Sequence, residues 1–459
     1  MRIRFFALAL ATLSLLTLLP GASSRALAEE QGAQVSAEWA DDKVDLPQLF
    51  DAVVDAVDKN FFDKAALAQG NWRERAQEMR PSALASPSID DAVRQINQLL
   101  SGLGVSHTGL YTPNDYLYYV LLDVTRGLAT RDFVGRRFWS SGLYYPGIGI
   151  FTRNVDGHDF VDGVLEGSPA EKAGLKFGDE ILSVDGQPYH PIEAFRKKIG
   201  AAAELMIRRT AGAAPERLTA TVIPIRPVQA FSDATEASAR IIERNGRRIG
   251  YVHVWALAES NSFAKALSAF SPYPSRYSLN MTFSLQIPIT GEMPKPVDAV
   301  IVDLRGRVGG NMDVAGQLLK YLDASGSYSY WGAWQTRPKP SGPVVVGGPL
   351  STSFRGRSAL LIDAQTRSAG EIMAYGYKHS TFGPLFGTRT AGAVMSGALY
   401  PMPGDMLLHL ATAGHEFDGH SLEGTGVTPD YQVEHPLPYA QGADPVLEAA
   451  ADFLAKAKQ

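Results

Sequence analysis

The stretch around which this chain is organised reads Ala359-Leu360-Leu361-Ile362-Asp363-Ala364-Gln365-Thr366-Arg367-Ser368-Ala369-Gly370-Glu371-Ile372-Met373-Ala374-Tyr375-Gly376-Tyr377-Lys378. Its apolar beginning predicts a buried strand, the polar segment 363–367 predicts a loop, and residues 369–378 predict a short helix. Ser368 therefore lies at the start of a helix. Backbone amides there have no intrahelical partner, and with the helix dipole they favour negative charge nearby.

Ser368 has two interpretations. As a nucleophile, its oxygen would attack a carbonyl group while the amide of Ala369 holds the resulting oxyanion. As a helix cap, it would bond to the first turn, and Glu371 would complete a Ser-x-x-Glu capping box. Capping boxes are far commoner than nucleophiles, so these residues alone favour the cap. The choice between the two interpretations therefore depends on motifs elsewhere in the chain.

The composition excludes several kinds of site. The chain has 459 residues, 45% hydrophobic and 20% charged, which is ordinary for a globular protein of several domains. A formal net charge of -5 without a long basic run argues against nucleic acid as a partner. Cysteine is absent, which excludes disulfides, thiol nucleophiles and cysteine metal sites.

The first 28 residues have the pattern of a secretory signal peptide. Arg2 and Arg4 precede an apolar run from Phe5 to Leu19, and Ala26-Leu27-Ala28 is a small-x-small cleavage site. An uncleaved anchor is the alternative, but the run is shorter than the roughly 20 residues that span a bilayer. We therefore expect a periplasmic or secreted protein with no membrane span after cleavage. Without a lipobox cysteine it is not a lipoprotein.

Residues 29–140 are expected to form a helical N-terminal region. After a polar start, apolar residues recur with helical spacing from Leu46 to Leu103. The glycine-rich stretch 101–108 ends this pattern and places Ser106 and His107 on a loop or a helix end.

Residues 145–227 form a second predicted unit. A short helix with Ser168 as its cap and Pro169 as its first residue closes at Gly174, and a strand then runs to the turn Asp185-Gly186. The pattern of small-Pro-Ala, Ala-Gly-Leu, Gly-Asp and Ile-x-x-Val-x-Gly closely resembles a PDZ domain. This resemblance implies that a peptide, usually a C-terminus, adds a strand at the domain's edge. Its carboxylate would be held by the loop that contains Tyr145, Gly147, Ile148 and Gly149. A PDZ-like spacer without a ligand is the alternative.

Residues 228–440 alternate between strand and helix patterns, which predicts an α/β domain, and residues 441–459 contain a closing helix. Residues 271–296 interrupt the alternation and read as an inserted loop or hairpin of unassigned role, such as a lid. The glycines of Asp303-Leu304-Arg305-Gly306-Arg307-Val308-Gly309-Gly310-Asn311 follow a buried strand. They would let the amide of Gly309 or Gly310 approach a reacting group. A plain turn or a phosphate loop is the alternative, although the spacing matches neither Walker nor Rossmann patterns.

Further motifs follow at Thr388-Arg389-Thr390-Ala391-Gly392 and at Glu423-Gly424-Thr425-Gly426-Val427-Thr428-Pro429-Asp430. In this order around a PDZ unit, the motifs over about 46–440 resemble the peptidase family of the tricorn protease core and the C-terminal processing peptidases. The resemblance implies an α+β multidomain protein with a crotonase-like α/β peptidase core. It makes the serine of Ser-Ala-x-Glu, here Ser368, the nucleophile.

The family has two ways of activating this serine. One branch resembles a Ser–Lys dyad with lysine in Thr-Phe-Gly-Lys-Gly, but here Ala393 takes the lysine's place and Lys378 does not match. The tricorn-like branch uses a Ser-His pair and a glutamate before Gly-Val-x-Pro-Asp, and the chain is closer to this branch. It implies that His107 is the general base, Ser106 its orienting partner and Glu423 a hydrogen-bonding carboxylate.

Each role has an alternative. His107 could be structural, as a histidine at this position is in the lysine-dependent branch. Glu423 could pair with Arg389 or Arg305. His415 and His420 suggest a zinc protease, but their spacing misses His-Glu-x-x-His by one residue.

We therefore expect an exported serine endopeptidase that cleaves peptides or unfolded proteins and needs no metal or cofactor. Its partners would be a peptide or protein substrate and a PDZ ligand, and it could self-associate as a homo-oligomer. We also expect His107 and Ser368 to lie within hydrogen-bonding reach, directly or through one water, in an active conformer. A non-catalytic peptide-binding scaffold and a hydrolase of small esters or amides are the rival interpretations.

Overall fold

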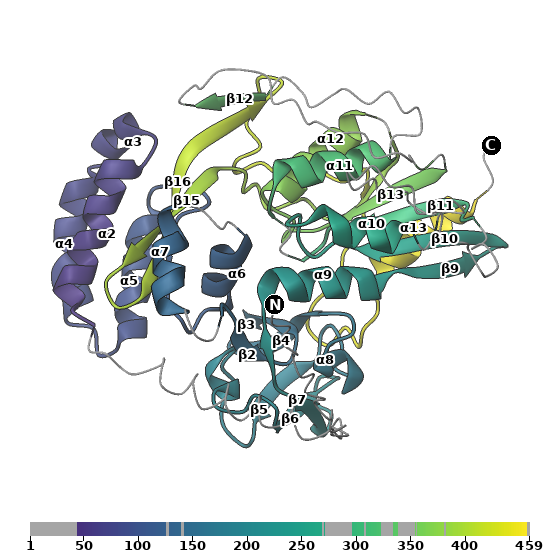
Figure 1. The fold of residues 1–459 in the computed structure, drawn as a ribbon, viewed down its shortest axis with the longest axis horizontal. Coiled ribbons are helices and arrows are strands. Elements are labelled where there is room, and N and C mark those ends of the chain that lie inside the picture. Colours follow the sequence, from purple (N-terminus) through teal and green to yellow (C-terminus); the bar gives the residue numbers. More distant parts are fainter. Residues whose placement is uncertain are drawn as a thin grey trace, which may run out of the picture.

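The computed structural model describes residues 44–456 except for 125–127, 139–141, 269, 271–295, 307–308, 323–333, 338–353, 355 and 381. The predicted signal peptide and all but the last residue of the predicted insert lie outside these described residues. In Figure 1 the N-terminal helices, the PDZ strands and the α/β core occupy three separate regions around the centre of the molecule. No helix among the described residues is long and apolar enough to cross a membrane.

The N-terminal region is helical, as the apolar spacing predicts. Its elements are α2 (Leu46–Asn60), α3 (Lys64–Gln69), α4 (Trp72–Leu84), α5 (Ile89–Ser101), α6 (Tyr116–Val124) and α7 (Leu128–Arg137). The side chains of Asp45, Asp63 and Ser88 cap α2, α3 and α5 by accepting hydrogen bonds from their first-turn amides.

The PDZ unit is built from an antiparallel sheet with the order β3-β4-β5-β6-β7 among its described strands. These strands are β3 (Ile150–Val155), β4 (His158–Val164), β5 (Glu180–Val184), β6 (Ala202–Arg208) and β7 (Glu216–Thr221). The unit also contains α8 (Pro169–Lys172), the 3₁₀ turn η1 (Glu193–Phe195), and the pair β2 (Tyr145–Gly147) and β8 (Ile223–Ile225). Ile148, Val161, Ile181 and Leu205 lie in its own apolar core.

The α/β core is organised on a sheet whose described strands have the order β17-β14-β13-β11-β10-β9. They are β9 (Arg240–Arg244), β10 (Arg247–His253), β11 (Ala299–Asp303), β13 (Arg357–Ile362), β14 (Leu385–Gly387) and β17 (Tyr431–Gln432). All neighbours are parallel except β9 and β10. The predicted strand at 359–362 is thus confirmed, and its apolar side chains are buried because helices cover both faces.

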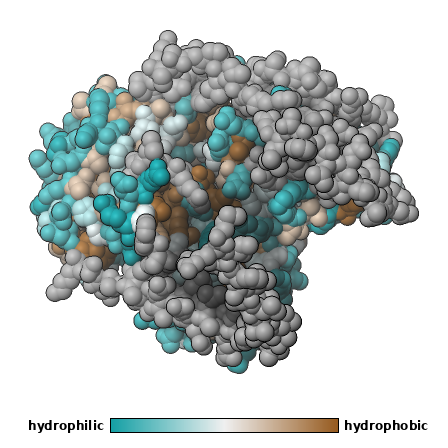
Figure 2. Space-filling view, viewed as in Figure 1, coloured by the Kyte–Doolittle hydropathy of each residue, from teal (hydrophilic) through white to brown (hydrophobic). Residues whose placement is uncertain are grey.

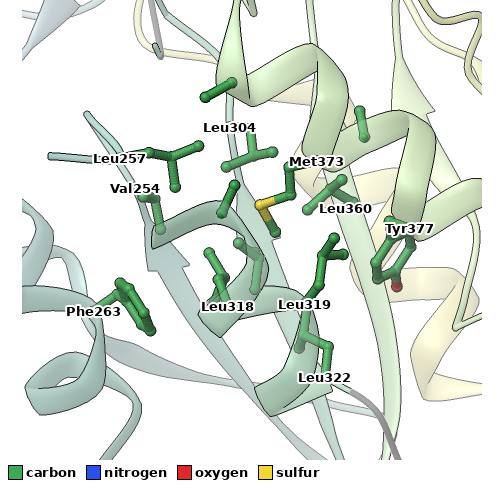
Figure 3. Close-up of a cluster of buried hydrophobic side chains, with 14 of the residues drawn as sticks. Val254, Leu257, Phe263, Leu304, Leu318, Leu319, Leu322, Leu360, Met373 and Tyr377 are labelled. Atoms are coloured by element: carbon green, nitrogen blue, oxygen red, sulfur yellow. The ribbon is translucent and has the colours of Figure 1, made fainter. Parts of the chain in front are cut away.

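Helices pack on both faces of this sheet. The apolar cluster on one face joins Leu360 of β13 and Leu304, which directly follows β11, to α10 (Ser260–Ser268), α11 (Met312–Leu322) and α12 (Ala369–His379), as Figure 3 shows. On the other face, α13 (Pro445–Ala455) packs with Val446, Leu447 and Leu454 against the strands. α9 (Pro227–Ser238) connects the PDZ unit to the core.

A second sheet links the N-terminal helices to the core, and the sequence analysis did not predict it. Its long strand β16 (Met406–Phe417) pairs antiparallel with β1 (Gly109–Tyr111), β12 (Trp334–Arg337) and β15 (Ser396–Met402). Leu408 and Leu410 pack against α2 and α5, whereas Phe417 lies in the apolar cluster of the core. Because β1 begins two residues after His107, its pairing with β16 brings the N-terminal region to the edge of the core.

Candidate active site

A pocket of about 800 Å³ lies between the N-terminal helices and the core. Ser106, His107, Gly309, Gly310, Ser368 and Ala369 all line it. Much of its remaining wall is apolar, with Leu117, Val120, Leu121 and Val124 from α6, Val228 and Phe231 from α9, and Met312 and Ile372 from the core helices. In the space-filling view of Figure 2, hydrophobic side chains gather in the hollow near the centre of the molecule. The fold therefore brings predicted catalytic residues some 260 positions apart in the sequence to one pocket.

Ser368 occupies a strained backbone conformation at the start of α12. Its φ of 54° and ψ of -127° differ from the extended geometry of an ordinary N-cap, and its side chain makes no capping hydrogen bond. Its amide donates to the carbonyl of Ala393 at 2.8 Å. Among the described residues, no group hydrogen-bonds to the Ser368 hydroxyl. The interpretation of Ser368 as a cap is therefore wrong, and its hydroxyl is available in the pocket.

Glu371 does not complete a capping box either. Its buried carboxylate accepts hydrogen bonds from the hydroxyl of Thr390 at 2.6 Å, the amide of Gly392 at 2.7 Å and the amide of Ala393 at 2.6 Å. Burial raises the pKa of this carboxyl group, while the three donors oppose the rise. Glu371 thus holds the segment 390–393 against α12, and that segment in turn holds the backbone of Ser368.

The candidate oxyanion donors surround Ser368. A Cβ atom added to Gly309 would lie 3.5 Å from the Cβ of Ser368, so the two backbones are close neighbours. Hydrogen bonds from the amide of Leu257 to the carbonyl of Gly309, at 2.9 Å, and from the amide of Asn311 to the carbonyl of Leu257, at 2.7 Å, fix this turn. No described residue accepts a hydrogen bond from the amides of Gly309, Gly310 or Ala369. Gly310 has a φ of 135°, and a Cβ there would meet the carbonyl oxygen of Leu257 at 2.5 Å, so only glycine fits.

Ser106, His107 and Glu423 form a hydrogen-bonded chain. The hydroxyl of Ser106 lies 2.9 Å from Nδ1 of His107 and donates to Oε2 of Glu423 at 3.0 Å. A hydroxyl has one proton to donate, so when it donates to the carboxylate it must accept from Nδ1–H. The other ring nitrogen, Nε2, then carries the lone pair, as a general base requires. No described residue hydrogen-bonds to Nε2, including the hydroxyl of Ser368.

The same carboxylate positions the backbone around it. Glu423 also accepts from the amide of Ser106 at 2.6 Å and from the amide of Val394 at 2.8 Å. The alternative that Glu423 pairs with Arg389 or Arg305 is wrong. Arg305 is instead buried between Asp303 and Asp444, with contacts of 2.6 Å and 2.7 Å.

His107 is held neutral by its surroundings. Burial in the pocket, followed by the nearby groups His409, Arg367 and His415, lowers its pKa to about 3. The rings of His107 and His409 meet edge to face with their centroids 5.2 Å apart. Gly397 permits this packing, because a Cβ there would lie 2.2 Å from Nε2 of His409 and 3.1 Å from Cβ of His107.

His409 and His415 line the pocket, which the sequence did not predict: His409 was not singled out, and His415 was considered only for a zinc motif that it does not match. No local pattern marks them, because the pairing of β15 with β16 changes register between Ser396 and Gly397, and simple alternation along β16 therefore does not predict which side chains share a face. Burial lowers the pKa of each to about 4, and His415 Nε2 lies 2.7 Å from the hydroxyl of Ser396. Within the described residues, no group of three His, Asp or Glu side chains is arranged to hold a metal ion.

The predicted peptide-carboxylate loop lies in the PDZ unit. Tyr145 and Ile148 are buried, and β2, which contains Tyr145 and Gly147, pairs with β8. The carbonyls of Ile148 and Gly149 accept from the amides of Ala170 and Leu165 at 3.0 Å and 2.9 Å. Their own amides donate to no acceptor in the described part of the chain. Carboxylate binding at this loop stays a prediction.

Comparisons with known proteins agree with this architecture. A model of peptidase family S41 matches residues 248–433, and a PDZ domain model matches residues 160–209. Tricorn protease homolog 2 of Streptomyces coelicolor is 24% identical over 412 residues, which are 83% of this chain and 30% of that protein. A carboxyl-terminal-processing protease of Picosynechococcus sp. is 24% identical over 307 residues, or 63% of this chain and 65% of that protein.

The chain thus spans less than two thirds of the length of these relatives. The solved structure of a photosystem II D1 C-terminal processing protease covers 90% of this chain at 19% identity with a TM-score of 0.49. By the family models, residues 248–433 of this chain are similar to peptidase family S41, and residues 160–209 are similar to a PDZ domain.

Proposed function

We propose that this protein is an exported serine peptidase that cleaves peptides or unfolded proteins, with Ser368 as nucleophile and His107 as general base. The observation that carries the proposal is the hydrogen-bonded chain from Glu423 through Ser106 to His107, which opens into the same pocket as the unbonded hydroxyl of Ser368. The family match and the names of the relatives support peptide hydrolysis.

The reaction follows from these roles. Nε2 of His107 takes the hydroxyl proton of Ser368 as Oγ adds to the scissile carbonyl, and the amides of Ala369 and of Gly309 or Gly310 stabilise the oxyanion. His107 returns the proton to the amine as the C–N bond breaks, which leaves an acyl-enzyme. Water, deprotonated by the same base, then adds to the acyl carbon, and His107 gives the proton to Oγ of Ser368 as the C–Oγ bond breaks, which releases the acid and restores the serine. Ser106 and Glu423 hold His107 in the required tautomer.

The apolar walls suit an unfolded chain better than a charged small molecule. Side chains from α6 and α9 line the pocket, so apolar residues of a substrate would be removed from water there. The free amides of Ile148 and Gly149 would hold the carboxylate of a PDZ ligand. The pattern of residues 1–28 supports export to the periplasm or the medium.

Labelling of the purified protein with a fluorophosphonate probe tests the proposal. We expect the wild type to be labelled and Ser368→Ala to be unlabelled, with labelling of His107→Ala at least about a hundredfold slower, because the serine would lose its base. Peptide cleavage should fall in parallel. Absence of both labelling and cleavage in the wild type, also with added peptides that engage the PDZ domain, would favour a non-catalytic scaffold. Labelling with cleavage of small esters but no peptide would favour the hydrolase interpretation.

A further inference from the structure

Arg367, directly before the nucleophile, is a cation in the active-site pocket that forms no ion pair with any acidic side chain in the described part of the chain. Its side chain is half-buried and lines the pocket together with His107 and Ser368. Nε donates to the carbonyl of Gln365 at 3.3 Å. Within the described part of the chain, nothing accepts a hydrogen bond from its two terminal nitrogens.

The lack of a partner is unusual for a guanidinium group in a partly apolar pocket. Removing a charge from water is costly unless the charge is paired. In the same domain, the buried charge of Arg305 is paired in the usual way, because its guanidinium group forms ion pairs with both Asp303 and Asp444. The two carboxylates that line the pocket, Asp123 and Glu259, form no ion pair with Arg367.

Arg367 lines the pocket that also contains the reacting groups. Its charge acts on His107 and on Tyr111, which both line the same pocket. A ligand that neutralised Arg367 would therefore lie beside Ser368. A carboxylate fits this position, because the planar guanidinium fork pairs with a carboxylate through two parallel hydrogen bonds.

We infer that Arg367 binds a carboxylate of the substrate and makes the peptidase select peptides with an acidic group close to the scissile bond. An extended peptide advances about 3.3–3.6 Å per residue, so the carboxylate would lie within about three residues of the bond. It is either an acidic side chain or the C-terminal carboxylate of the substrate. The inference rests on the proposed function, since it assigns a preference to the same site.

The loop that carries Arg367 is fixed from the PDZ side. The Gln365 side-chain amide donates to Oδ2 of Asp162, a PDZ residue, at 2.6 Å. The backbone carbonyl of Gln365 accepts from Nε of Arg367. Asp162 also pairs with Arg153 at 3.0 Å. These contacts hold the Gln365 backbone, whose carbonyl in turn accepts from Nε of Arg367, so they restrict the motion of this side chain before substrate arrives.

The test is a set of matched peptides with one cleavable core. Glu, Gln or Lys is placed in turn at each of three positions on either side of the bond, and each peptide is made with a free or an amidated C-terminus. Cleavage rates and sites are measured for the wild type, Arg367→Gln and Arg367→Glu. Arg389→Gln is the matched control, because Arg389 is an exposed arginine of the same domain that does not line the pocket.

We expect the wild type to prefer the acidic peptide over its neutral partner by at least about tenfold in kcat/KM, as one charge-assisted hydrogen bond would give. The preference should fall to about one in Arg367→Gln, turn toward Lys in Arg367→Glu, persist in Arg389→Gln and weaken with added salt. If fast cleavage requires Glu with either a free or an amidated C-terminus, the carboxylate bound by Arg367 belongs to an acidic side chain. Dependence on the free C-terminus near the bond identifies the terminal carboxylate.

Three outcomes would overturn the inference, and they differ in what they say of the proposed function. Equal cleavage of acidic and neutral peptides by a wild type that fluorophosphonate labels would refute the carboxylate site and leave the serine peptidase intact. A preference that survives in Arg367→Gln would do the same. No labelling and no cleavage at all would refute both. Circular dichroism of each variant separates a lost preference from a lost fold.

Discussion

Two serines of this chain begin a helix with the same pattern, Ser-x-x-Glu, and the structure uses them in opposite ways. Ser168 begins α8 with a φ of -70° and a ψ of 164°, and its hydroxyl accepts from the amide of Glu171 at 3.2 Å. The Glu171 carboxylate accepts from the amide of Gly167 at 2.7 Å, close to the reciprocal contact of a capping box. Ser368 has a positive φ and no capping bond, and Glu371 is turned into the core.

The difference lies in the backbone and in the burial of the glutamate. With φ in the extended region, the Ser168 hydroxyl points at the first-turn amides and satisfies one of them. With φ at 54°, the Ser368 hydroxyl makes no hydrogen bond to the first turn, and so it is not used up as a cap. The strain of such a conformation costs about 1–3 kcal/mol, and the contacts of Glu371 and Ala393 hold it in place.

The largest expected contrast comes from changing each serine to alanine. Ser368→Ala should lower peptide cleavage by more than about a thousandfold and leave the free energy of unfolding within about 0.5 kcal/mol, because no cap is lost. Ser168→Ala should keep cleavage and lose about 1 kcal/mol of stability. Steady-state assays and urea unfolding measure the two effects. Loss of stability in Ser368→Ala equal to that in Ser168→Ala would break the comparison.

The glutamates give the next contrast. In Glu371→Gln one side-chain oxygen that accepts from a backbone amide becomes an NH₂ group, so a buried donor faces a donor, at a cost of about 1–3 kcal/mol. The shift of Ala393 would release the backbone of Ser368, and we expect kcat to fall at least about tenfold with little change in KM. Glu171→Gln, at an exposed site, should change stability by about 0.5 kcal/mol or less.

An unchanged kcat in folded Glu371→Gln would show that the segment 390–393 does not position the nucleophile. Glu371→Asp is the control, since it keeps the charge but shortens the reach and should lose activity as well.

The sequence predicted the elements around Ser368 but not its conformation. The apolar run at 359–362 and the helix 369–378 are confirmed, because local patterns determine them. The choice between cap and nucleophile depends on Ala393 and Gly392, more than twenty positions away in the sequence, and no local pattern carries that information. The resemblance to a family supplied it, since it pointed to Ser106, His107 and Glu423 together. The chain Glu423–Ser106–His107 agrees with that grouping, whereas β16 and its two histidines went unpredicted.

The dependence of activity on pH tests whether His107 is the general base. With its pKa lowered to about 3, His107 stays neutral and able to accept a proton well below pH 6. We expect kcat/KM to be nearly flat from pH 7 to about 5, whereas a base with the ordinary histidine pKa would lose about 25-fold over that range. The profile should be measured together with circular dichroism, and an acid limb centred near 6.5 in a folded protein would contradict the assignment.

The free energy of unfolding should also decrease as the pH falls from 7 to about 5. His107, His409 and His415 have lowered pKa values in the folded state, so the unfolded chain binds more protons once the pH falls below about 6.5. Stability from these groups is present above that pH and is lost as the pH falls toward about 4. Urea unfolding at pH 7 and pH 5 should show this loss, and replacing His409 with Gln should reduce it.

The smallest contrast, and the one that tests the strain directly, replaces each serine with glycine. Glycine adopts positive φ without the steric penalty of a side chain, so Ser368→Gly should raise the free energy of unfolding by about 1 kcal/mol while cleavage is lost. Ser168→Gly removes a capping hydroxyl at an ordinary backbone angle and should lower stability by a few tenths of a kcal/mol. Opposite signs in urea unfolding would mean that the molecule gives up stability at Ser368 in order to keep its hydroxyl uncapped. Changes of the same sign would mean that the surroundings of Ser368 relieve the strain, and the contrast between the two serines would then rest on the hydrogen bonds alone.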